Sequence, residues 1–390
     1  MKWVIIILYS LYFGLLPFDN LKELSGDTIT KTLGLALIAV LSIIFFVKKE
    51  KKLKINFFNI YISIIFITYS ITYFIIFGIS DSSYIRFCFL FLLFFLSSQL
   101  EIKEKALIKI LDYSSFIISI ISLSSIFLNL KLNYIDRTHY YIWNNMSVDA
   151  NIYCSTLIFP ILYLLNKLFD KNINHKFFST ILLIPMIASM FVSGSRGGLL
   201  AIAVGVISLM IFDNSQVSNK KIKILYLIIF IALIYLIIPY LPDNIVNRLS
   251  FSAVIKDKAS DRFEIWKYAI SKFSSSNLFQ MIFGYGFLSF RSALNLRSVS
   301  HNLIIQTLIE GGIIMITIFL SLYIKLLKYF KEKKSYIMIS YMLAVLIMSC
   351  SLDVIISRFL WNSFIIINFF INYYSNKEKY KMEIEVSMVF

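Results

Sequence analysis

Residues 57–79 read FFNIYISIIFITYSITYFIIFGI, a run without a single charged side chain. A helix that crosses the hydrocarbon core of a bilayer needs ~20 apolar residues, because its backbone groups must satisfy one another there. This stretch therefore predicts a transmembrane helix. It follows a lysine-rich run from Lys48 to Lys54, so charged interruptions mark where such helices end.

The same pattern recurs along the 390 residues, of which 59% are hydrophobic and 15% charged, with a mean hydropathy of +0.79. This composition excludes a water-soluble surface. We predict one all-α, polytopic membrane domain over residues 1–390, with about twelve transmembrane helices. The predicted segments lie near 3–18, 31–47, 57–79, 84–100, 106–129, 151–169, 177–193, 198–212, 223–241, 301–324, 335–356 and 358–375. The seventh and eighth segments are short and closely spaced, so a re-entrant pair is the alternative.

Lysine runs orient the predicted helices. With the N-terminus inside the cell, the lysine-rich loops fall on the cytoplasmic side, as the positive-inside rule requires. They hold Lys48 to Lys54, Lys103, Lys105, Lys167, Lys171, Lys176, Lys220, Lys221, Lys223, Lys325 to Lys334, Lys377, Lys379 and Lys381. The net charge of +16 thus reflects topology rather than nucleic-acid binding. Both termini are predicted to be cytoplasmic, and residues 242–300 to form one long extracytoplasmic loop containing short helices.

Arginine is distributed differently from lysine. All eight arginines fall at or near the predicted outer side: Arg86, Arg137, Arg196, Arg248, Arg262, Arg291, Arg297 and Arg358. Because the chain otherwise prefers lysine, we expect these positions to need the planar, bidentate guanidinium group. The alternative is that arginine is missing from the inner loops by drift.

Residues 193–198, SGSRGG, form a glycine-rich turn between two apolar segments. Glycine lets backbone N–H groups and the arginine approach an anion closely. Arg196 is therefore a candidate anion-binding residue. The alternative is a tight helical hairpin whose arginine only reaches to the membrane interface.

Residues 261–266, DRFEIW, lie in the long loop. Asp261 followed by Glu264 is a capping-box pattern, which predicts that a short helix begins here. Its apolar stripe predicts a helix on the membrane surface, with Trp266 at headgroup level. Arg262 opposes the helix dipole in the first turn, which favours an anion nearby. The stripe consists of Ile265, Trp266, Ala269, Ile270 and Phe273.

A polar stripe opens the tenth segment. Asn302, Gln306 and Glu310 recur at helical spacing and must face protein or water. Glu310 is a functional candidate because ionisable residues are rare inside membrane helices; the alternative is a neutral, paired side chain. His301, at the mouth of the segment, can act as a base near neutral pH, although a single interfacial histidine is more often structural.

Two weaker motifs are Asp149-Ala150-Asn151, which helix capping would explain, and Gly284-Tyr285-Gly286, which a turn would explain. In this order, the motifs resemble those of the O-antigen polymerase and ligase superfamily, the Wzy/WaaL-type bacterial membrane glycosyltransferases. The resemblance runs from about Asp149 to Gly312. One departure is Ala150, where family members often have proline.

The resemblance implies polymerisation of undecaprenyl-pyrophosphate-linked repeat units into O-antigen or capsular polysaccharide, at the outer leaflet of the bacterial inner membrane. Glycosyl transfer would need no metal and no other cofactor. Arg196 and Arg262 would neutralise charge on the pyrophosphate, and His301 would take the proton from the acceptor hydroxyl. Further substrate contacts are expected from Arg291, Arg297, Asn302, Glu310 and Trp266. The implied partners are the lipid-linked donor and acceptor, the bilayer and a candidate chain-length regulator protein.

Two other functions stay open. A ligase would use the same donor but move the finished glycan to lipid A core or another acceptor, and the spacing of Gly312 from His301 also fits ligases. A flippase or transporter of lipid-linked sugars is the alternative from another class. Transporters tend to show internal repeats and charges at the bilayer midplane, whereas this sequence shows neither.

Overall fold

The structure of the protein is a computed structural model. It describes residues 2–19, 21, 29–47, 53–78, 81–131, 139–143, 146–170, 176–212, 223–225, 228, 232, 235–236, 238–249, 262–296, 299–352 and 355–387, with side chains to residue 377.

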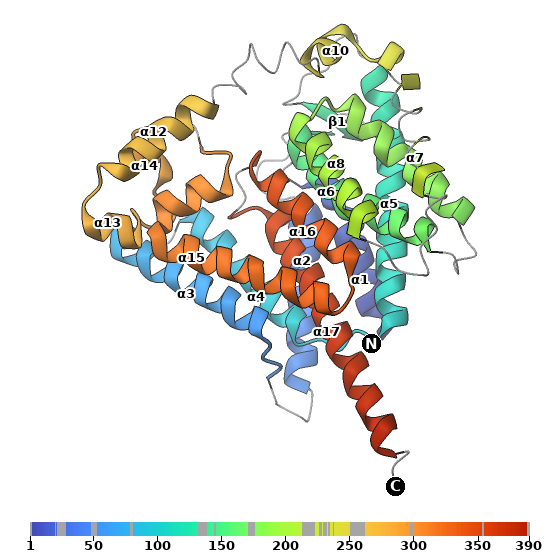
Figure 1. Ribbon diagram of the computed structural model, residues 1–390, viewed down its shortest axis with the longest axis horizontal. Coiled ribbons are helices and arrows are strands. Elements are labelled where there is room, and N and C mark those ends of the chain that lie inside the picture. Colours follow the sequence, from blue (N-terminus) through green and yellow to red (C-terminus); the bar gives the residue numbers. More distant parts are fainter. Residues whose placement is uncertain are drawn as a thin grey trace.

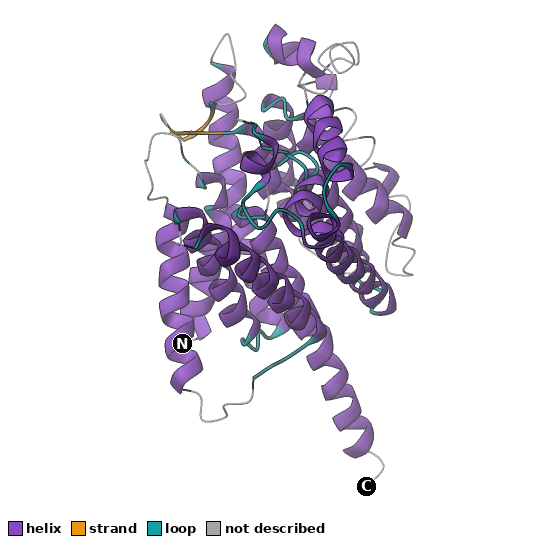
Figure 2. Cartoon of the chain, turned by 90° about the vertical axis from the view of Figure 1, so that its left-hand side faces the viewer, coloured by secondary structure: helices purple, strands orange, loops and turns teal. Residues whose placement is uncertain are grey.

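Most of the described chain is helical (Figure 2). The longer helices are α1 (Lys2–Gly14), α2 (Ile29–Val47), α3 (Phe57–Phe77), α4 (Ser82–Ser98), α5 (Glu104–Leu130), α6 (Ala150–Phe169), α7 (Lys176–Val192), α8 (Arg196–Phe212), α15 (Leu303–Glu332), α16 (Tyr336–Ser349) and α17 (Arg358–Ser387). The shorter elements are η1 (Leu16–Phe18), β1 (Tyr140–Trp143), β2 (Met146–Val148), η2 (Ile238–Tyr240), α10 (Asp243–Leu249), α12 (Arg262–Ser274), α13 (Leu278–Phe283) and α14 (Phe290–Leu294).

Eleven of the twelve predicted segments correspond to described helices, each of which begins within two residues of the predicted start. The remaining segment, 223–241, is interrupted by residues outside the described ones, so its prediction as one helix is not tested. Among the described helices, α2, α3, α5, α6 and α15 are long and apolar enough to cross a membrane, while α1, α4, α7, α8 and α16 are apolar but shorter. The chain is therefore a largely helical membrane protein, and the number of twelve spans stays a prediction.

The helices form a bundle with a smaller group of short helices at one corner (Figure 1). On one side, α5 packs against α1 and α7, and α8 packs against α16 and α6. On the other, α15 packs against α3, and α12, α13 and α14 pack against α15. The helices α7 and α8, for which a re-entrant pair was the alternative, both pack on α6, while α7 also packs on α5 and α8 on α16.

The predicted continuous helix over 301–324 is wrong in one respect. The helix α15 is interrupted at Gly312, whose φ of 64° and ψ of −164° are not helical. The pattern of apolar residues does not detect such a break because both halves are apolar. The helix also continues to Glu332, so Lys325 and Lys328 lie on its last turns rather than in a loop.

Two further differences concern short elements. The all-α prediction omitted the antiparallel hairpin β1–β2, which pairs Tyr140 with Val148 and Tyr141 with Ser147. Strands this short carry too few alternating positions to be recognised. The eleventh predicted segment, 335–356, corresponds to a helix that already ends at Ser349.

A buried ion pair joins the two ends of the sequence. Asp19 follows η1 and pairs with Arg358, the first residue of α17. Both are at most 6% exposed. Thr30 of α2 completes the contact by donating to Asp19 at 3.0 Å and accepting from Arg358 at 2.8 Å. The pair thereby fastens the first two helices to the last.

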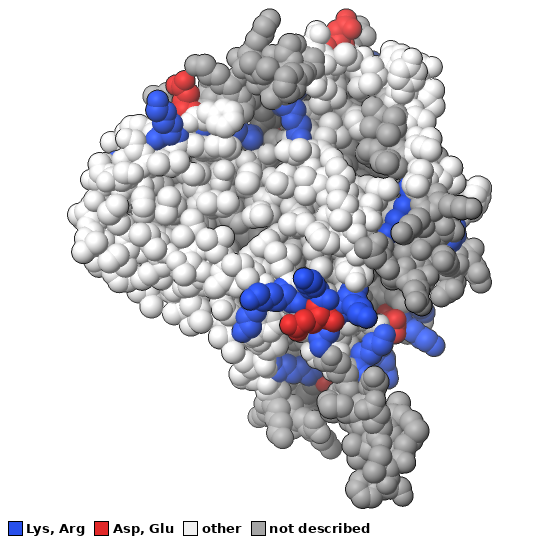
Figure 3. All heavy atoms as spheres, viewed as in Figure 1, with Lys and Arg blue, Asp and Glu red and all other residues white. Residues whose placement is uncertain are grey.

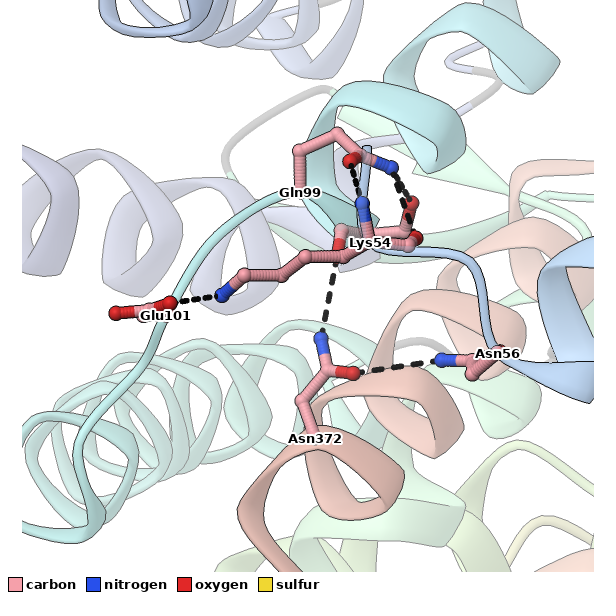
Figure 4. A network of polar contacts seen from close by, with 6 residues as sticks. Lys54, Asn56, Gln99, Glu101 and Asn372 are labelled. Carbon is pink, nitrogen blue, oxygen red and sulfur yellow. Dashed lines mark hydrogen bonds and ion pairs between the residues drawn. The ribbon is translucent and has the colours of Figure 1, made fainter. Parts of the chain in front are cut away.

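A second polar network joins α3, α4 and α17 (Figure 4). Lys54 forms an ion pair with Glu101 at 2.5 Å, and its backbone N–H donates to the side chain of Gln99 at 2.9 Å. The Asn372 amide donates to the carbonyl oxygen of Ser98 at 3.2 Å, and that of Asn56 donates to Asn372 at 3.4 Å. This network joins the three helices next to the lysine-rich run from Lys48 to Lys54.

Over the left and centre of the visible face, charged side chains gather in two belts with a broad uncharged band between them, and further Lys or Arg side chains lie at the right-hand side (Figure 3). One belt lies over α12 and α10, and the other lies at the far end of α15, where Lys325, Lys328 and Lys331 are exposed. Both chain termini lie toward the second belt (Figure 1). A band of this kind is the surface expected to contact hydrocarbon.

Candidate active site

The turn between α7 and α8 is held by hydrogen bonds to α6. The hydroxyl of Ser195 donates to Asn151 Oδ1 at 2.7 Å and accepts from the backbone N–H of Gly198 at 3.1 Å, which makes Ser195 the N-cap of α8. Asn151 is 5% exposed and follows Asp149, the N-cap of α6. Two predicted motifs therefore contact each other.

Close packing fixes this turn further. A Cβ on Gly198 would lie 2.5 Å from the Cβ of Cys154 in α6, so only glycine permits this approach. Gly194 adopts a left-handed conformation with φ +61°, which favours glycine as well. The backbone at the start of α8 is consequently held on two sides.

Arg196 is the first residue of α8 and is half-buried. Its Nε donates to the carbonyl oxygen of Arg248 at 2.8 Å, which joins α8 to α10. A guanidinium group has five N–H donors, and this contact uses one of them. The side chain is thus anchored to α10 through its Nε.

The short helices form a compact unit with α15. We call α12, α13, α14 and residues 299–311 the loop unit. It has its own hydrophobic core, separate from that of the bundle, built on Ala269, Phe290, Leu294 and Ile309. Ile265 and Phe273 pack against this core, whereas Ile270 of the same stripe is 48% exposed. Part of the stripe therefore faces protein, and its contact with the membrane surface stays a prediction.

His301 occupies the corner where the loop unit enters α15. It adopts a left-handed conformation with φ +47° and is half-buried. On one side, Ser300 is 1% exposed; on the other, Asn302 caps α15 by accepting from the N–H groups of Ile304 and Ile305 at 3.0 and 3.2 Å. Non-glycine residues seldom adopt this conformation, so the neighbours must hold it.

Arg262 and Trp266 begin α12 and face the same side, one helical turn apart. The indole N–H of Trp266 donates to the carbonyl oxygen of Ser300 at 2.8 Å. The half-buried Trp266 side chain is therefore tied to the residue before His301 rather than only placed among lipid headgroups. Asp261, the predicted N-cap, lies outside the described residues.

Glu310 lies inside the loop unit and is 1% exposed. Its Oε1 accepts from Gln306 Nε2 at 3.3 Å and from the N–H of Phe290 at 3.4 Å. Its backbone carbonyl accepts from Gly286 at 3.0 Å. The next residue after Phe290, Arg291, is exposed. Glu310 thus holds the start of α14 and the backbone that carries Arg291.

The break at Gly312 lets the Gly284 to Gly286 segment lie against α15. Tyr285 donates its N–H to the carbonyl oxygen of Ile309 at 2.8 Å. A Cβ on Gly312 would lie 2.6 Å from the backbone nitrogen of Gly284, so the two chains meet backbone to backbone. The Gly284-Tyr285-Gly286 motif thus contacts the segment that carries the polar stripe of α15.

The structure therefore sorts the predicted site residues into two clusters. One cluster, in the loop unit, contains Arg262, Trp266, Arg291, His301, Asn302 and Glu310. Arg196 belongs to the other, on α8 and α10. Arg297 lies outside the described residues. Among the residues that are described, no three His, Cys, Asp or Glu side chains lie close enough to share a metal ion.

Sequence reasoning did not predict the contacts of three residues that it had quoted. Ser195 had a usable signal, because serine directly before an apolar helix is a typical N-cap. Arg248 and Ser300 contribute backbone carbonyl groups, which no residue pattern reveals. Asn151 was noted only as a capping candidate.

Comparison with known proteins agrees with the resemblance. The model of the O-antigen ligase family matches residues 181–320, a range that includes Arg196, the loop unit and the break at Gly312. No curated protein matches the chain. The match and the apolar helices indicate a membrane protein of the bacterial inner membrane. Residues 181–320 are therefore similar to the O-antigen ligase family, which is consistent with the Wzy/WaaL-type superfamily.

Proposed function

We propose that this protein is a glycosyltransferase that polymerises undecaprenyl-pyrophosphate-linked repeat units into O-antigen or capsular polysaccharide at the outer leaflet. The observation that carries the proposal is the hydrogen bond from Trp266 to Ser300, which joins the helix of Arg262 to the corner of His301. A cation and a base are thus held in one unit, within a segment that matches the O-antigen ligase family.

In the proposed reaction, a hydroxyl of the acceptor repeat unit attacks the anomeric carbon of the donor glycan. The bond from that carbon to the pyrophosphate oxygen breaks, and His301 takes the hydroxyl proton through a ring nitrogen. Undecaprenyl pyrophosphate leaves with the bonding electron pair. Arg262 and Arg196 stabilise its negative charge through charge-assisted hydrogen bonds, a task that a divalent metal performs in many sugar transferases.

The other predicted residues contact the acceptor or shape the site. Exposed Arg291 is suited to contact the acceptor, as is Arg297 from its sequence position. Asn302 and Glu310 are buried and hydrogen-bonded within the protein, which favours a role for both residues in shaping the site.

We further propose twelve spans with both termini in the cytoplasm and the loop unit outside. The exposed lysines near the end of α15, on the side of both termini, support this orientation through the positive-inside rule. The lipid-linked substrates would then reach the loop unit from the outer leaflet.

The description of the matched family favours a second candidate, an O-antigen ligase. It would use the same donor and the same residues but would transfer the finished glycan to a different acceptor. Deleting the gene and separating the surface polysaccharide on a gel distinguishes the two. Loss of a polymerase leaves single repeat units on the acceptor, loss of a ligase leaves no attached glycan, and a flippase defect traps lipid-linked units inside the membrane.

Point variants returned to the deletion strain test the chemistry. Arg196→Ala, Arg262→Ala and His301→Ala are each expected to reduce chain extension by ~100-fold or more, since each removes charge stabilisation or proton transfer. The measurement is the ladder on the same gel, with protein amount checked in isolated membranes. His139→Ala, which changes an exposed residue outside both clusters, serves as the matched control. A wild-type ladder from all three site variants would contradict the proposal.

A further inference from the structure

Trp266 has a specific hydrogen-bonding task. Its indole N–H donates to the carbonyl oxygen of Ser300 at 2.8 Å, and its side chain is half-buried. We infer that Trp266 is a positioning residue that fixes the backbone of His301 and so sets the base relative to Arg262. This inference rests on the proposed function, because it assigns the base of that reaction to His301.

His301 needs such support because of its backbone. Its φ of +47° lies in a region that non-glycine residues rarely occupy, and such a conformation persists only where the surroundings determine it. Both neighbours are fixed. Trp266 holds the Ser300 carbonyl group, the N–H of Asn302 donates to the Ser300 hydroxyl at 3.2 Å, and Asn302 caps α15.

Trp266 can act as a support because its own helix is fixed. The helix α12 packs through Ile265, Ala269 and Phe273 on the core that it shares with α14 and α15. The ring of Phe263 meets the Trp266 ring edge-on, with centroids 5.4 Å apart. The backbone that carries Trp266 is therefore held by the core of the loop unit.

One consequence concerns the spacing of the reacting groups. Arg262 lies one turn before Trp266 on the same helix, so this hydrogen bond, together with the packing of α12 on α15, couples the cation to the base. Loss of the bond changes how far the leaving pyrophosphate lies from the hydroxyl that loses its proton. A sugar-stacking role for Trp266 would instead affect only how tightly substrate binds.

Trp266→Phe tests the inference because it keeps an aromatic ring and removes the N–H donor. The assay uses the purified full chain in lipid nanodiscs and, as substrate, the undecaprenyl-pyrophosphate-linked glycan extracted from cells that lack this protein. We expect kcat to fall about 10- to 100-fold with KM for this glycan nearly unchanged, because displaced catalytic groups slow chemistry without weakening binding. Trp143→Phe, at an exposed tryptophan in β1, is the matched control and should keep both constants.

The possible outcomes separate the two proposals. An unchanged kcat for Trp266→Phe, or a rise in KM alone, would overturn the positioning role, the latter in favour of sugar stacking. Activity retained by His301→Ala in the same assay would instead refute the proposed function. Thermal melting of each variant in nanodiscs confirms that it is folded. If Trp266→Phe melts early, Trp266→Tyr, which restores a ring-borne donor, should recover kcat where the positioning role holds.

Discussion

Asn151 and Ser195 meet at the point where Arg196 begins α8. Their side chains form a 2.7 Å hydrogen bond away from solvent, where it competes with no water. The sequence alone identified Arg196 and marked Asn151 as a capping candidate. It could not supply the contact between them, because the two residues lie on different helices and no local pattern fixes how those helices pack.

Removing this contact should release Arg196. We expect Asn151→Ala and Ser195→Ala each to lower activity by ~10-fold or more, because the start of α8 loses its anchor, and Ser195→Ala also to cost about 1 kcal/mol as a lost N-cap. Activity in nanodiscs and the melting temperature are the measurements. Ser208→Ala removes a buried hydroxyl farther along α8 that bonds only to its own helix, and should leave activity intact. Equal activity loss in all three variants would argue against a specific role for the contact.

The broken helix α15 and the segment around Gly284 act as one element. The predicted helix start, at residue 301, was nearly correct, because the polar residues and N-cap there are local signals. The interruption at Gly312 was not predicted. Its only sequence signal is the Gly311-Gly312 pair, and the cause of the break, a backbone 28 to 30 residues earlier in the chain, is a tertiary contact.

Gly312→Ala should disrupt that element. Alanine at φ 64° and ψ −164° is strained by ~1–3 kcal/mol, and its Cβ would also clash with the backbone of Ile282. We expect a lower melting temperature and a large loss of activity. Gly78→Ala is the control, since Gly78 also has a positive φ of +68° but faces open space. Similar losses in both variants would show that positive φ alone, and not the backbone contact, is responsible.

At the scale of the whole molecule, charge distribution was the most informative part of the sequence. Lysine spacing indicated which loops share a side, and the exposed lysines of α15 lie toward both termini (Figures 1 and 3). The count of spans was harder to derive, because α7, α8 and α16 are shorter than a simple membrane-spanning helix and hydropathy alone does not say how such helices lie in a bilayer.

Cysteine labelling of intact cells tests the orientation. A cysteine at Glu264, on the exposed face of α12, should react with a membrane-impermeant maleimide from outside. A cysteine at Lys331, on the last turn of α15, should react only after the membrane is permeabilised. The unmodified chain, with Cys88, Cys154 and Cys350, gives the background signal. Labelling of Lys331→Cys in intact cells would reverse the proposed topology.

The ion pair between Asp19 and Arg358 also governs how the protein is made. The ribosome delivers the carboxylate hundreds of residues before its guanidinium partner, and a buried charge without its partner costs several kcal/mol. We therefore expect the packing of α1 and α2 to be completed only after α17 is inserted. A chain that stops short of α17 would lack the partner that this buried carboxylate requires.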